Sequence, residues 1–426
     1  MRKMRDSGIE WVGAIPQNWQ LSKIGSLYTQ RNEKVSDKDY QPLSVTMQGI
    51  LPQLATAAKT DDGDNRKLVR VGDFAINSRS DRRGSCGISP LDGSVSLINI
   101  ILTPRTAMHP GYYNWLFHTT LFADEFYKWG HGIVADLWTT RWQEMKSITV
   151  PVPEYAEQER IAAFLDAECA EIDAVSEKTR ASIEEYKKLK QAVITQAVTK
   201  GIRGDRPMKD SGIEWIGDIP ESWEVSSVRY IGQLQNGISK GGEFFGKGFP
   251  FVSYGDVYKN YELPYSVSGL IDTTEDERAT YSVEYGDIFF TRTSETIEEV
   301  GFSCVCKRLI PNATFAGFII RLRPFCADEK ILTDYAKYYF RGEHIRAYLV
   351  KEMNLVTRAS LGQTLLKGMS VIVPPKSAQK EIAEYLDDKC ADIDALVAKK
   401  QQYLTEIENY KKSLIYEYVT GKKEVV

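Results

Sequence analysis

One stretch of the sequence occurs twice and constrains everything else that the chain can build. Residues 150–175 read VPVPEYAEQERIAAFLDAECAEIDAV, and residues 371–396 read VIVPPKSAQKEIAEYLDDKCADIDAL. The two copies are offset by 221 positions and are identical at 13 of 26. A repeat at this spacing indicates that one structural element is built twice, so the fold must accommodate two equivalent halves.

Each copy predicts a long helix. Prolines stand only at the start of each copy, where a helix tolerates them. Neither copy then contains a proline or a glycine until Gly201 and Gly421, which are suited to end a helix in the left-handed conformation. At ~1.5 Å per residue, the stretch from Gln158 to Thr199 spans roughly 60 Å.

Both expected helices carry a stripe that steps alternately by three and four residues. The stripe consists of Ile172, Val175, Thr179, Ser182, Tyr186, Leu189, Val193 and Gln196 in the first copy, and of Ile393, Leu396, Lys400, Tyr403, Ile407, Tyr410, Leu414 and Glu417 in the second. A helix of this length cannot bury its stripe against itself, so we expect the two copies to pair as a two-stranded coiled coil. The alternative is two separate amphipathic helices, each lying on a globular domain.

A second repeated block precedes each half. Residues 4–19 (MRDSGIEWVGAIPQNW) and residues 208–223 (MKDSGIEWIGDIPESW) are offset by 204 positions and agree at 11 of 16. The pattern W-x-G-x-I-P-x-x-W predicts an extended segment held by buried aromatic rings. Stacking of these tryptophans on nucleic-acid bases is the functional alternative, and we favour packing because the block recurs in both halves.

The regions between block and helix, about residues 20–149 and 224–370, match poorly. Both mix short strands, turns and a helical stretch, and both contain a Gly-Asp pair, Gly72-Asp73 and Gly286-Asp287. They are therefore predicted to be two divergent copies of one mixed α+β domain. The expected division is residues 1–153 for the first domain with its entry segment, 154–200 for the first helix, 201–374 for the second domain with its linker, and 375–426 for the second helix.

Composition limits the classes of protein to which the chain can belong. The 426 residues are 42% hydrophobic and 26% charged, which is ordinary for a globular protein, and the net charge is −4. No apolar run approaches the ~20 residues that span a bilayer, and the start MRKMRDSGIEW lacks the apolar core of a secretory signal, so we expect a cytoplasmic protein. The six cysteines and four histidines show no metal-ligand spacing, and we expect no metal site.

Catalytic patterns are missing from the sequence. There is no phosphate-binding G-x-x-x-x-G-K-[ST] loop, no Asn/Asp-Pro-Pro-aromatic tetrapeptide of amino-methyltransferases and no H-E-x-x-H. We therefore expect a protein that is not an enzyme and holds no cofactor of its own.

What remains is a recognition pattern of basic and small polar residues. Arginine can pair with guanine edges or phosphates, and amide and hydroxyl side chains supply shorter contacts. The candidate DNA-binding residues of the first half are Arg66, Lys67, Arg70, Asn77, Arg79, Ser80, Arg82 and Arg83. Those of the second half are Ser239, Lys240, Lys247, Arg292, Thr293, Ser294 and Arg358. A solvated polar loop without function is the competing interpretation of such clusters.

The chain resembles the specificity subunit of type I restriction–modification systems. The resemblance rests on W-x-G-x-I-P-x-x-W at Trp11–Trp19 and Trp215–Trp223, on P-x-x-x-x-Q-x-x-I-A-x-x-L-D at Pro153–Asp166 and Pro374–Asp387, and on the helix ends Ala-Val-Thr and Tyr-Val-Thr-Gly. It implies an α+β fold in which two similar mixed α/β target recognition domains are separated by two long helices, paired as an antiparallel coiled coil with an internal pseudo-twofold repeat.

The resemblance also implies a function. Each recognition domain would read one half of a bipartite, asymmetric site in double-stranded DNA. The helices would dock two methyltransferase subunits, with motor-nuclease subunits added for cleavage, and these partners would bind S-adenosylmethionine and ATP. We expect the methyltransferase contacts on the outer helix faces, including Glu171, Glu177, Arg180, Glu184 and Lys187.

A second hypothesis is a structural adaptor that binds only protein while its partners hold the DNA. The negative net charge and the acidic residues that follow Ser294 favour this alternative. The sequence does not give the bases read or the spacer between the half-sites.

Overall fold

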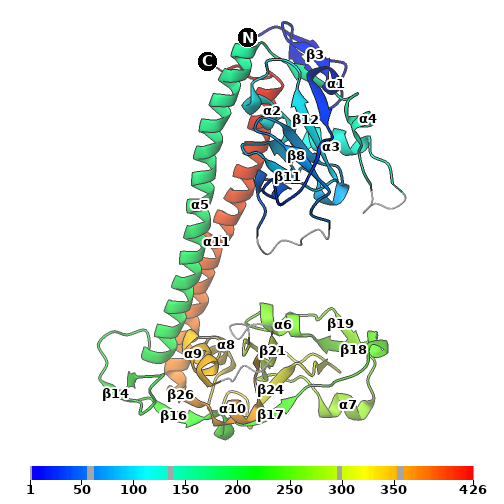
Figure 1. The fold of residues 1–426 in the computed structure, drawn as a ribbon. Coiled ribbons are helices and arrows are strands. Elements are labelled where there is room, and N and C mark those ends of the chain that lie inside the picture. The colour runs from blue at the N-terminus through cyan, green and yellow to red at the C-terminus, as the bar shows by residue number, and fades with distance from the viewer. Residues whose placement is uncertain (1, 55–61, 133–137, 295–299, 353–358, 426) are drawn as a thin grey trace. The chain divides into compact units, whose positions relative to one another are not determined.

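The computed structural model describes residues 2–54, 62–132, 138–294, 300–352 and 359–425 (Figure 1). The chain forms two compact units. The first unit consists of residues 1–180 and 401–426, and the second unit consists of residues 181–400. Because the long helices α5 (Tyr155–Lys200) and α11 (Lys376–Val419) each contribute residues to both units, each unit contains one end of each helix.

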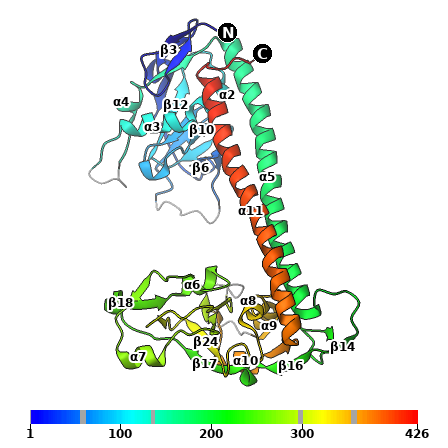
Figure 2. The same cartoon turned by 180° about the vertical axis from the view of Figure 1, so that it is seen from behind.

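The two long helices confirm the prediction made from the repeat, and they lie side by side in both views (Figure 1, Figure 2). In the first unit, Lys411 Nζ lies 2.6 Å from Asp173 Oδ1. In the second unit, Lys190 Nζ lies 2.6 Å from Asp394 Oδ2. Residue numbers rise along α5 as they fall along α11, so the helices run antiparallel.

Ten of the sixteen positions of the expected stripe are buried or half-buried, and six are exposed. Ile172, Thr179, Ile393, Ile407 and Leu414 are buried or half-buried as expected. The exposed apolar members of the expected stripe are Val175, Leu189, Leu396, Tyr403 and Tyr410. Their places in the seam are taken by the next residue along each helix, namely Ser176, Lys190, Val397, Leu404 and Lys411.

The hydroxyl of Ser176 gives a physical reason for this shift. Its Oγ donates to the carbonyl oxygen of Ile172 at 2.9 Å within the same helix, so the side chain can be buried without losing a hydrogen bond. Ser176 is 5% exposed, whereas Val175 beside it is 40% exposed. Hydrophobicity alone therefore selects the wrong one of two adjacent residues.

The first unit is built on a four-stranded antiparallel sheet. Its order is β10 (Cys86–Ile88), β9 (Phe74–Asn77), β12 (Asn99–Pro104) and β4 (Tyr28–Arg31). Beside it lie the three-stranded sheet β11 (Gly93–Val95), β8 (Arg66–Val69) and β5 (Lys34–Val35), and the hairpin β6 (Leu43–Thr46) and β7 (Gly49–Pro52). The helices are α1 (Ile24–Leu27), α2 (Pro110–Phe117), α3 (Thr120–Lys128) and α4 (Trp142–Met145).

The second unit repeats this sheet in the same order. Its strands are β22 (Ser303–Val305), β20 (Ile288–Thr291), β24 (Ile319–Pro324) and β17 (Gly232–Asn236). A second sheet contains β19 (Gly269–Ile271), β18 (Phe245–Val252) and β23 (Thr314–Phe315). The helices are α6 (Tyr254–Lys259), α7 (Glu275–Thr280), α8 (Thr333–Tyr339), α9 (Glu343–Glu352) and α10 (Gln363–Gly368). The shared strand order confirms two divergent copies of one mixed domain.

A buried carboxylate marks the same point in both sheets. Asp73 is buried at the start of β9, where Arg31 Nε donates to its Oδ2 at 2.8 Å. Asp287 is buried at the start of β20, where Arg323 Nη2 donates to its Oδ2 at 2.6 Å. The arginine comes from β4 in one unit and from β24 in the other, so the ion pair is kept while its sequence position changes.

The repeated entry blocks cover the ends of the long helices. Each forms a short antiparallel hairpin, β1 (Met4–Asp6) with β2 (Ala14–Pro16), and β14 (Met208–Asp210) with β15 (Asp218–Pro220). Strands β3 (Gln20–Lys23) and β16 (Glu224–Ser227) follow and pair with β13 (Thr149–Val152) and β26 (Ser370–Val373), which lead into the long helices.

The tryptophans of these blocks pack inside the protein. Trp19 and Trp223 are fully buried against Gly421 and Gly201, the left-handed glycines that follow α11 and α5. Packing, rather than base stacking, is therefore confirmed for these two residues. A side chain at either glycine would meet the indole and would also strain the backbone, since both have positive φ angles.

Two glutamines fasten the domains to the long helices. In the first unit, Gln158 Oε1 accepts from the backbone N–H of His109 at 2.9 Å, and its Nε2 donates to the Pro153 carbonyl. In the second unit, Gln379 Oε1 accepts from the N–H of Leu332 at 2.7 Å, and its Nε2 donates to the Pro374 carbonyl at 2.8 Å.

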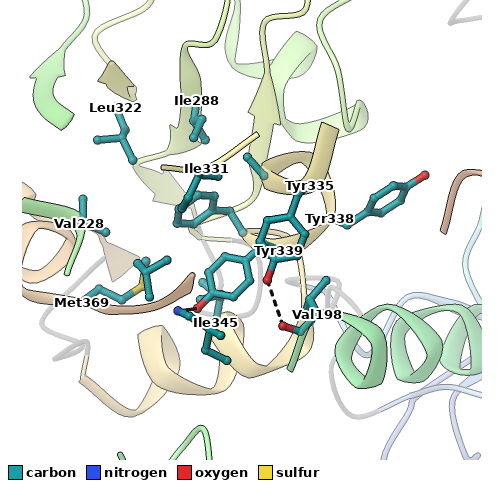
Figure 3. Close-up of a cluster of buried hydrophobic side chains, with 14 of the residues drawn as sticks. Val198, Val228, Ile288, Leu322, Ile331, Tyr335, Tyr338, Tyr339, Ile345 and Met369 are labelled. Carbon is teal, nitrogen blue, oxygen red and sulfur yellow. Dashed lines mark hydrogen bonds between the residues drawn. The ribbon is translucent and has the colours of Figure 1, made fainter. Parts of the chain in front are cut away.

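Two tyrosines hold the opposite helix ends. Tyr112 donates through its hydroxyl to the Val419 carbonyl of α11 at 2.8 Å, and Tyr335 donates to the Val198 carbonyl of α5 at 3.1 Å (Figure 3). Each domain is thus hydrogen-bonded to the start of one long helix and to the end of the other. Among the described residues, no helix is apolar over a length that would cross a membrane.

Candidate nucleic-acid interface

Three backbone segments meet where β9 ends in the first unit. The Ser78 hydroxyl donates to the Ile98 carbonyl, and the Ser78 carbonyl accepts from the N–H of Thr140 at 3.0 Å. Arg79 then pairs with Thr139 through an isolated antiparallel bridge. The loop after β9, the turn before β12 and the segment before α4 are therefore fixed to one another at a single point.

The second unit contains the same junction where β20 ends. The N–H of Arg292 donates to the Phe318 carbonyl at 2.9 Å, and its carbonyl accepts from the N–H of Leu361 at 2.7 Å. Strands β21 (Thr293–Ser294) and β25 (Ala359–Ser360) pair directly beyond it. We call this arrangement the three-segment junction in both units.

The arginines of the first junction lie at its surface. The exposed Arg79 precedes the short turn Ser80–Arg82, the exposed Arg82 is the last residue of this turn, and Arg83 follows it. Arg83 forms an ion pair with Asp124, and its guanidinium lies over the ring of Tyr127. The Tyr127 hydroxyl donates to the carbonyls of Asn77 and Arg82, so the loop that carries these arginines is anchored at both ends.

The five other candidates of the first unit bond to residues of their own domain. The Arg66 guanidinium is buried and donates to Ser94, and burial lowers its pKa. Lys67 Nζ donates to the Asn99 carbonyl at 2.6 Å, and burial lowers the pKa of this amine. Arg70 pairs with Asp92 at 3.1 Å, and the buried Asn77 accepts from the N–H of Arg79. Ser80 is half-buried, and its N–H donates to the Trp138 carbonyl.

The second-unit candidates fall into two groups. Lys240 Nζ lies 2.6 Å from Glu277 Oε2, and Lys247 Nζ lies 3.9 Å from Asp272 Oδ2, whereas Ser239 is exposed. Arg292, Thr293 and Ser294 form the strand end at the junction. Arg358 and the acidic residues 295–299 lie outside the described residues.

The candidate partner-binding residues lie on the outside of α5. Glu171 is exposed, Arg180 pairs with Glu177 and also reaches Glu408 of α11 at 3.0 Å, and Lys187 pairs with Glu184. These pairs are exposed, so each contributes little to stability. Their charges remain at the surface of the helix pair.

Cys304 and Cys306 behave as packed thiols. Both are buried, and burial raises the pKa of Cys306 to about 11 and that of Cys304 further. A thiol that stays protonated is a poor metal ligand. No group of three or more His, Cys, Asp or Glu side chains that could hold a metal occurs among the residues that the structure describes.

Sequence reasoning missed several residues of the second junction. Gln363 Nε2 donates to Asn236 Oδ1 at 2.9 Å beside it, and Phe318 lies exposed in its central turn. Their partners are distant in sequence, so only alignment of the two units through β9 and β20 would have pointed to them.

Residues 220–408 match the family described as the type I restriction modification DNA specificity domain. The type I restriction enzyme EcoKI specificity subunit of Escherichia coli (strain K12) is 22% identical, over 96% of this chain and 90% of the relative. The StySPI specificity subunit of Salmonella potsdam is also 22% identical, with the same coverage.

Solved structures share the fold. A chain from a study of complex assembly and conformational transition of the type I R-M system gives a TM-score of 0.72 at 14% identity, covering 96% of this chain and 99% of that one. The HsdS subunit from Thermoanaerobacter tengcongensis gives 0.51 at 16% identity, covering 96% and 98%.

The duplicated mixed domains and the antiparallel helix pair define the fold as a two-domain scaffold. Over nearly its whole length the chain is similar to specificity subunits of type I restriction–modification systems, and residues 220–408 match the type I restriction modification DNA specificity domain.

Proposed function

We propose that the chain is the non-catalytic DNA-recognition subunit of its complex, and that each unit reads one half of a bipartite, asymmetric target. The observation that carries the proposal is the three-segment junction. The same backbone arrangement occurs in both units, but it presents Arg79 in one and Thr293 at the matching place in the other. Two equivalent platforms with different side chains suit two half-sites with different sequences.

The first junction has the chemistry for DNA contact. Arg79 and Arg82 are exposed on a loop anchored by Tyr127, so their guanidinium groups can reach phosphates or base edges without unfolding the domain. Arg66 and Lys67 instead serve the fold through their internal partners, and we assign them no direct contact, whereas the exposed Arg70, which pairs with the exposed Asp92, remains a candidate. Ser239, Lys240, Lys247 and Arg358 remain candidates for the second half-site, together with Arg292, Thr293 and Ser294.

We further propose that the outer faces of the helices dock two methyltransferase subunits, with motor-nuclease subunits completing a cleaving complex. Charges that protrude from a rigid helix select partners by complementarity more than they stabilise the chain itself. Cofactors for methyl transfer and DNA translocation would then belong to those partners.

A charge-reversal experiment tests the docking surface. Glu177→Lys together with Glu184→Lys is expected to abolish co-purification of the methyltransferase subunit while the circular dichroism spectrum of the chain is unchanged. Asp276→Lys on the surface of α7, away from the long helices, serves as the control. Unchanged co-purification of the double variant would contradict the proposed surface.

Exchange of residues 224–370 with those of a related subunit separates DNA reading from the adaptor hypothesis. A recognition subunit transfers the donor's half-site to the hybrid. An adaptor leaves the methylated sequence unchanged, because its partners would hold the DNA.

A further inference from the structure

Phe318 is an aromatic residue exposed to solvent in the second unit. It lies in the turn that joins β23 to β24, and 64% of its surface is accessible. The residues that follow it, Ile319 and Ile320, are fully buried. A single exposed phenyl ring needs no explanation by itself, so the case for a contact rests on the fixed backbone and the polar groups that surround Phe318 at the junction.

The backbone that carries Phe318 is fixed from two sides. Its carbonyl accepts from the N–H of Arg292, which is the central contact of the junction. On the other side, Ile238 pairs with Ala316, and its N–H donates to the Phe315 carbonyl at 2.9 Å. A Cβ atom at Gly317 would lie 2.2 Å from Ser239 Oγ, so the close approach of the two loops requires glycine there.

Polar side chains on neighbouring segments are of the kinds that hydrogen-bond to base edges. Ser239 is exposed on the adjacent loop, and the amide groups of Asn236 and Gln363 are bonded to each other. Arg292 is half-buried and has no carboxylate within ion-pair distance among the described residues. Arginine, amide and hydroxyl groups discriminate bases in the major groove, and an apolar group adjoining them can contact the thymine methyl group or a base face.

We propose that Phe318 makes an apolar contact with a base of the half-site read by the second unit, and so contributes to specificity at one position. This inference rests on the proposed DNA-recognition function and names a residue and a type of contact within it. The matching position of the first unit is Ile98, whose carbonyl accepts from Ser78 as that of Phe318 accepts from Arg292. The aromatic contact therefore belongs to the second half-site alone.

The same strand offers a matched control. Phe325 follows the other end of β24 and is also 64% exposed, and its N–H donates to the Ile231 carbonyl. At ~3.3 Å per residue the two phenylalanines lie roughly 23 Å apart along the strand direction. Phe318→Ala and Phe325→Ala therefore remove the same side chain at the same exposure, but only the first removes it from the junction.

The test measures binding of the complex with its methyltransferase subunits to three duplexes: the cognate site, a site with the second half scrambled, and a site with both halves scrambled. Phe318→Ala is expected to weaken binding of the cognate site by roughly ten-fold while leaving the scrambled sites unaffected. Phe325→Ala is expected to stay within about two-fold of the unchanged complex on every duplex. Thermal melting of both variants checks that folding is intact.

A further arm identifies the part of the base that is contacted. Each thymine of the second half-site is replaced in turn by deoxyuridine, which lacks the methyl group. Loss of the thymine preference in Phe318→Ala at one position assigns the contact to that methyl group, and an affinity loss that is independent of the replacement assigns it to a base face.

Two results would overturn the inference: equal behaviour of the two alanine variants, or an equal loss of cognate and scrambled binding in Phe318→Ala. If the unsubstituted complex does not distinguish cognate from scrambled DNA, the proposed function itself fails, and that outcome is separate.

Discussion

At the scale of single residues, identity in the repeat does not by itself reveal a role. Gln158 and Gln379 are identical across the two copies, and their motif supports the resemblance to specificity subunits. Only the structure shows that each amide joins a long helix to its domain through buried hydrogen bonds. The partners, His109 and Leu332, lie 49 and 47 residues away, which is why local pattern could not identify them.

Gln379→Ala is therefore expected to destabilise the second unit. The change leaves the N–H of Leu332 and the Pro374 carbonyl without their buried partner, which costs about 2 kcal/mol. Urea denaturation of the chain measures the loss. Gln402→Ala is the control on the same helix, because the side chain of Gln402 is exposed and donates to the exposed Glu406. Equal effects of the two changes would show that the amide of Gln379 does not fasten the domain.

The buried His344 predicts a dependence of stability on pH. It packs between Trp215 and Tyr339, neither ring nitrogen has a hydrogen-bond partner among the residues that the structure describes, and burial lowers its pKa from 6.5 to about 3. Below pH 6.5 the unfolded chain binds a proton at His344 that the folded chain excludes. The free energy of unfolding therefore has its full value above pH 6.5 with respect to this group, and it decreases as the pH falls.

We expect His344→Phe to reduce the decline in unfolding free energy below pH 6.5 by about 1.4 kcal/mol per pH unit. Denaturation of both proteins at neutral and mildly acidic pH compares the slopes. Parallel slopes would mean that His344 does not contribute to the acid sensitivity.

At the scale of elements, the sequence predicts each long helix and its heptad step, but it does not settle which of two adjacent residues enters the seam. Leu404 is 4% exposed, whereas Tyr403 beside it is 48% exposed. Both are apolar, and steps of three or four residues fit either one. The surface of the partner helix decides which residue is buried. The seam includes the small side chains of Ser176 and Thr179, whose hydroxyls donate to carbonyls of their own helix.

Substitution of these neighbours tests the seam. Leu404→Ala should lower the free energy of unfolding by about 3 kcal/mol because it creates a cavity between the helices. Tyr403→Ala should lower it by less than about 1 kcal/mol, since its ring is half in water. Thermal denaturation of the chain alone distinguishes the two, and a larger effect at Tyr403 would reverse the register.

The candidate recognition loop shows a similar limit. Its basic residues are evident from the sequence, but their burial is not. Arg66 and Lys67 precede the loop on β8 and donate to Ser94 and Asn99, which belong to later strands. Arg79 and Arg82 stay at the surface because a turn carries them beyond the end of β9. Hydrogen bonds to distant strands, rather than charge, distinguish the structural residues Arg66 and Lys67 from the candidate DNA contacts Arg79 and Arg82.

At the scale of the whole molecule, the duplication could be predicted from the sequence because it is written twice, and both units fold accordingly. What could not be predicted is how each domain uses both helices. Tyr112 of the first unit bonds to the end of α11, and Tyr335 of the second unit bonds to the end of α5. These contacts between a domain and the end of a long helix arise from chain topology, which local sequence patterns do not encode.

The central claim is that two equivalent units read two different half-sites. Methylome sequencing tests it most directly, in cells that express the chain with its methyltransferase, with and without Arg79→Ala, Arg82→Ala and Arg83→Ala combined. We predict a split methylation motif in which one half loosens in the variant while the other half is unchanged. An unsplit motif, or a split motif indifferent to the three substitutions, would contradict the account.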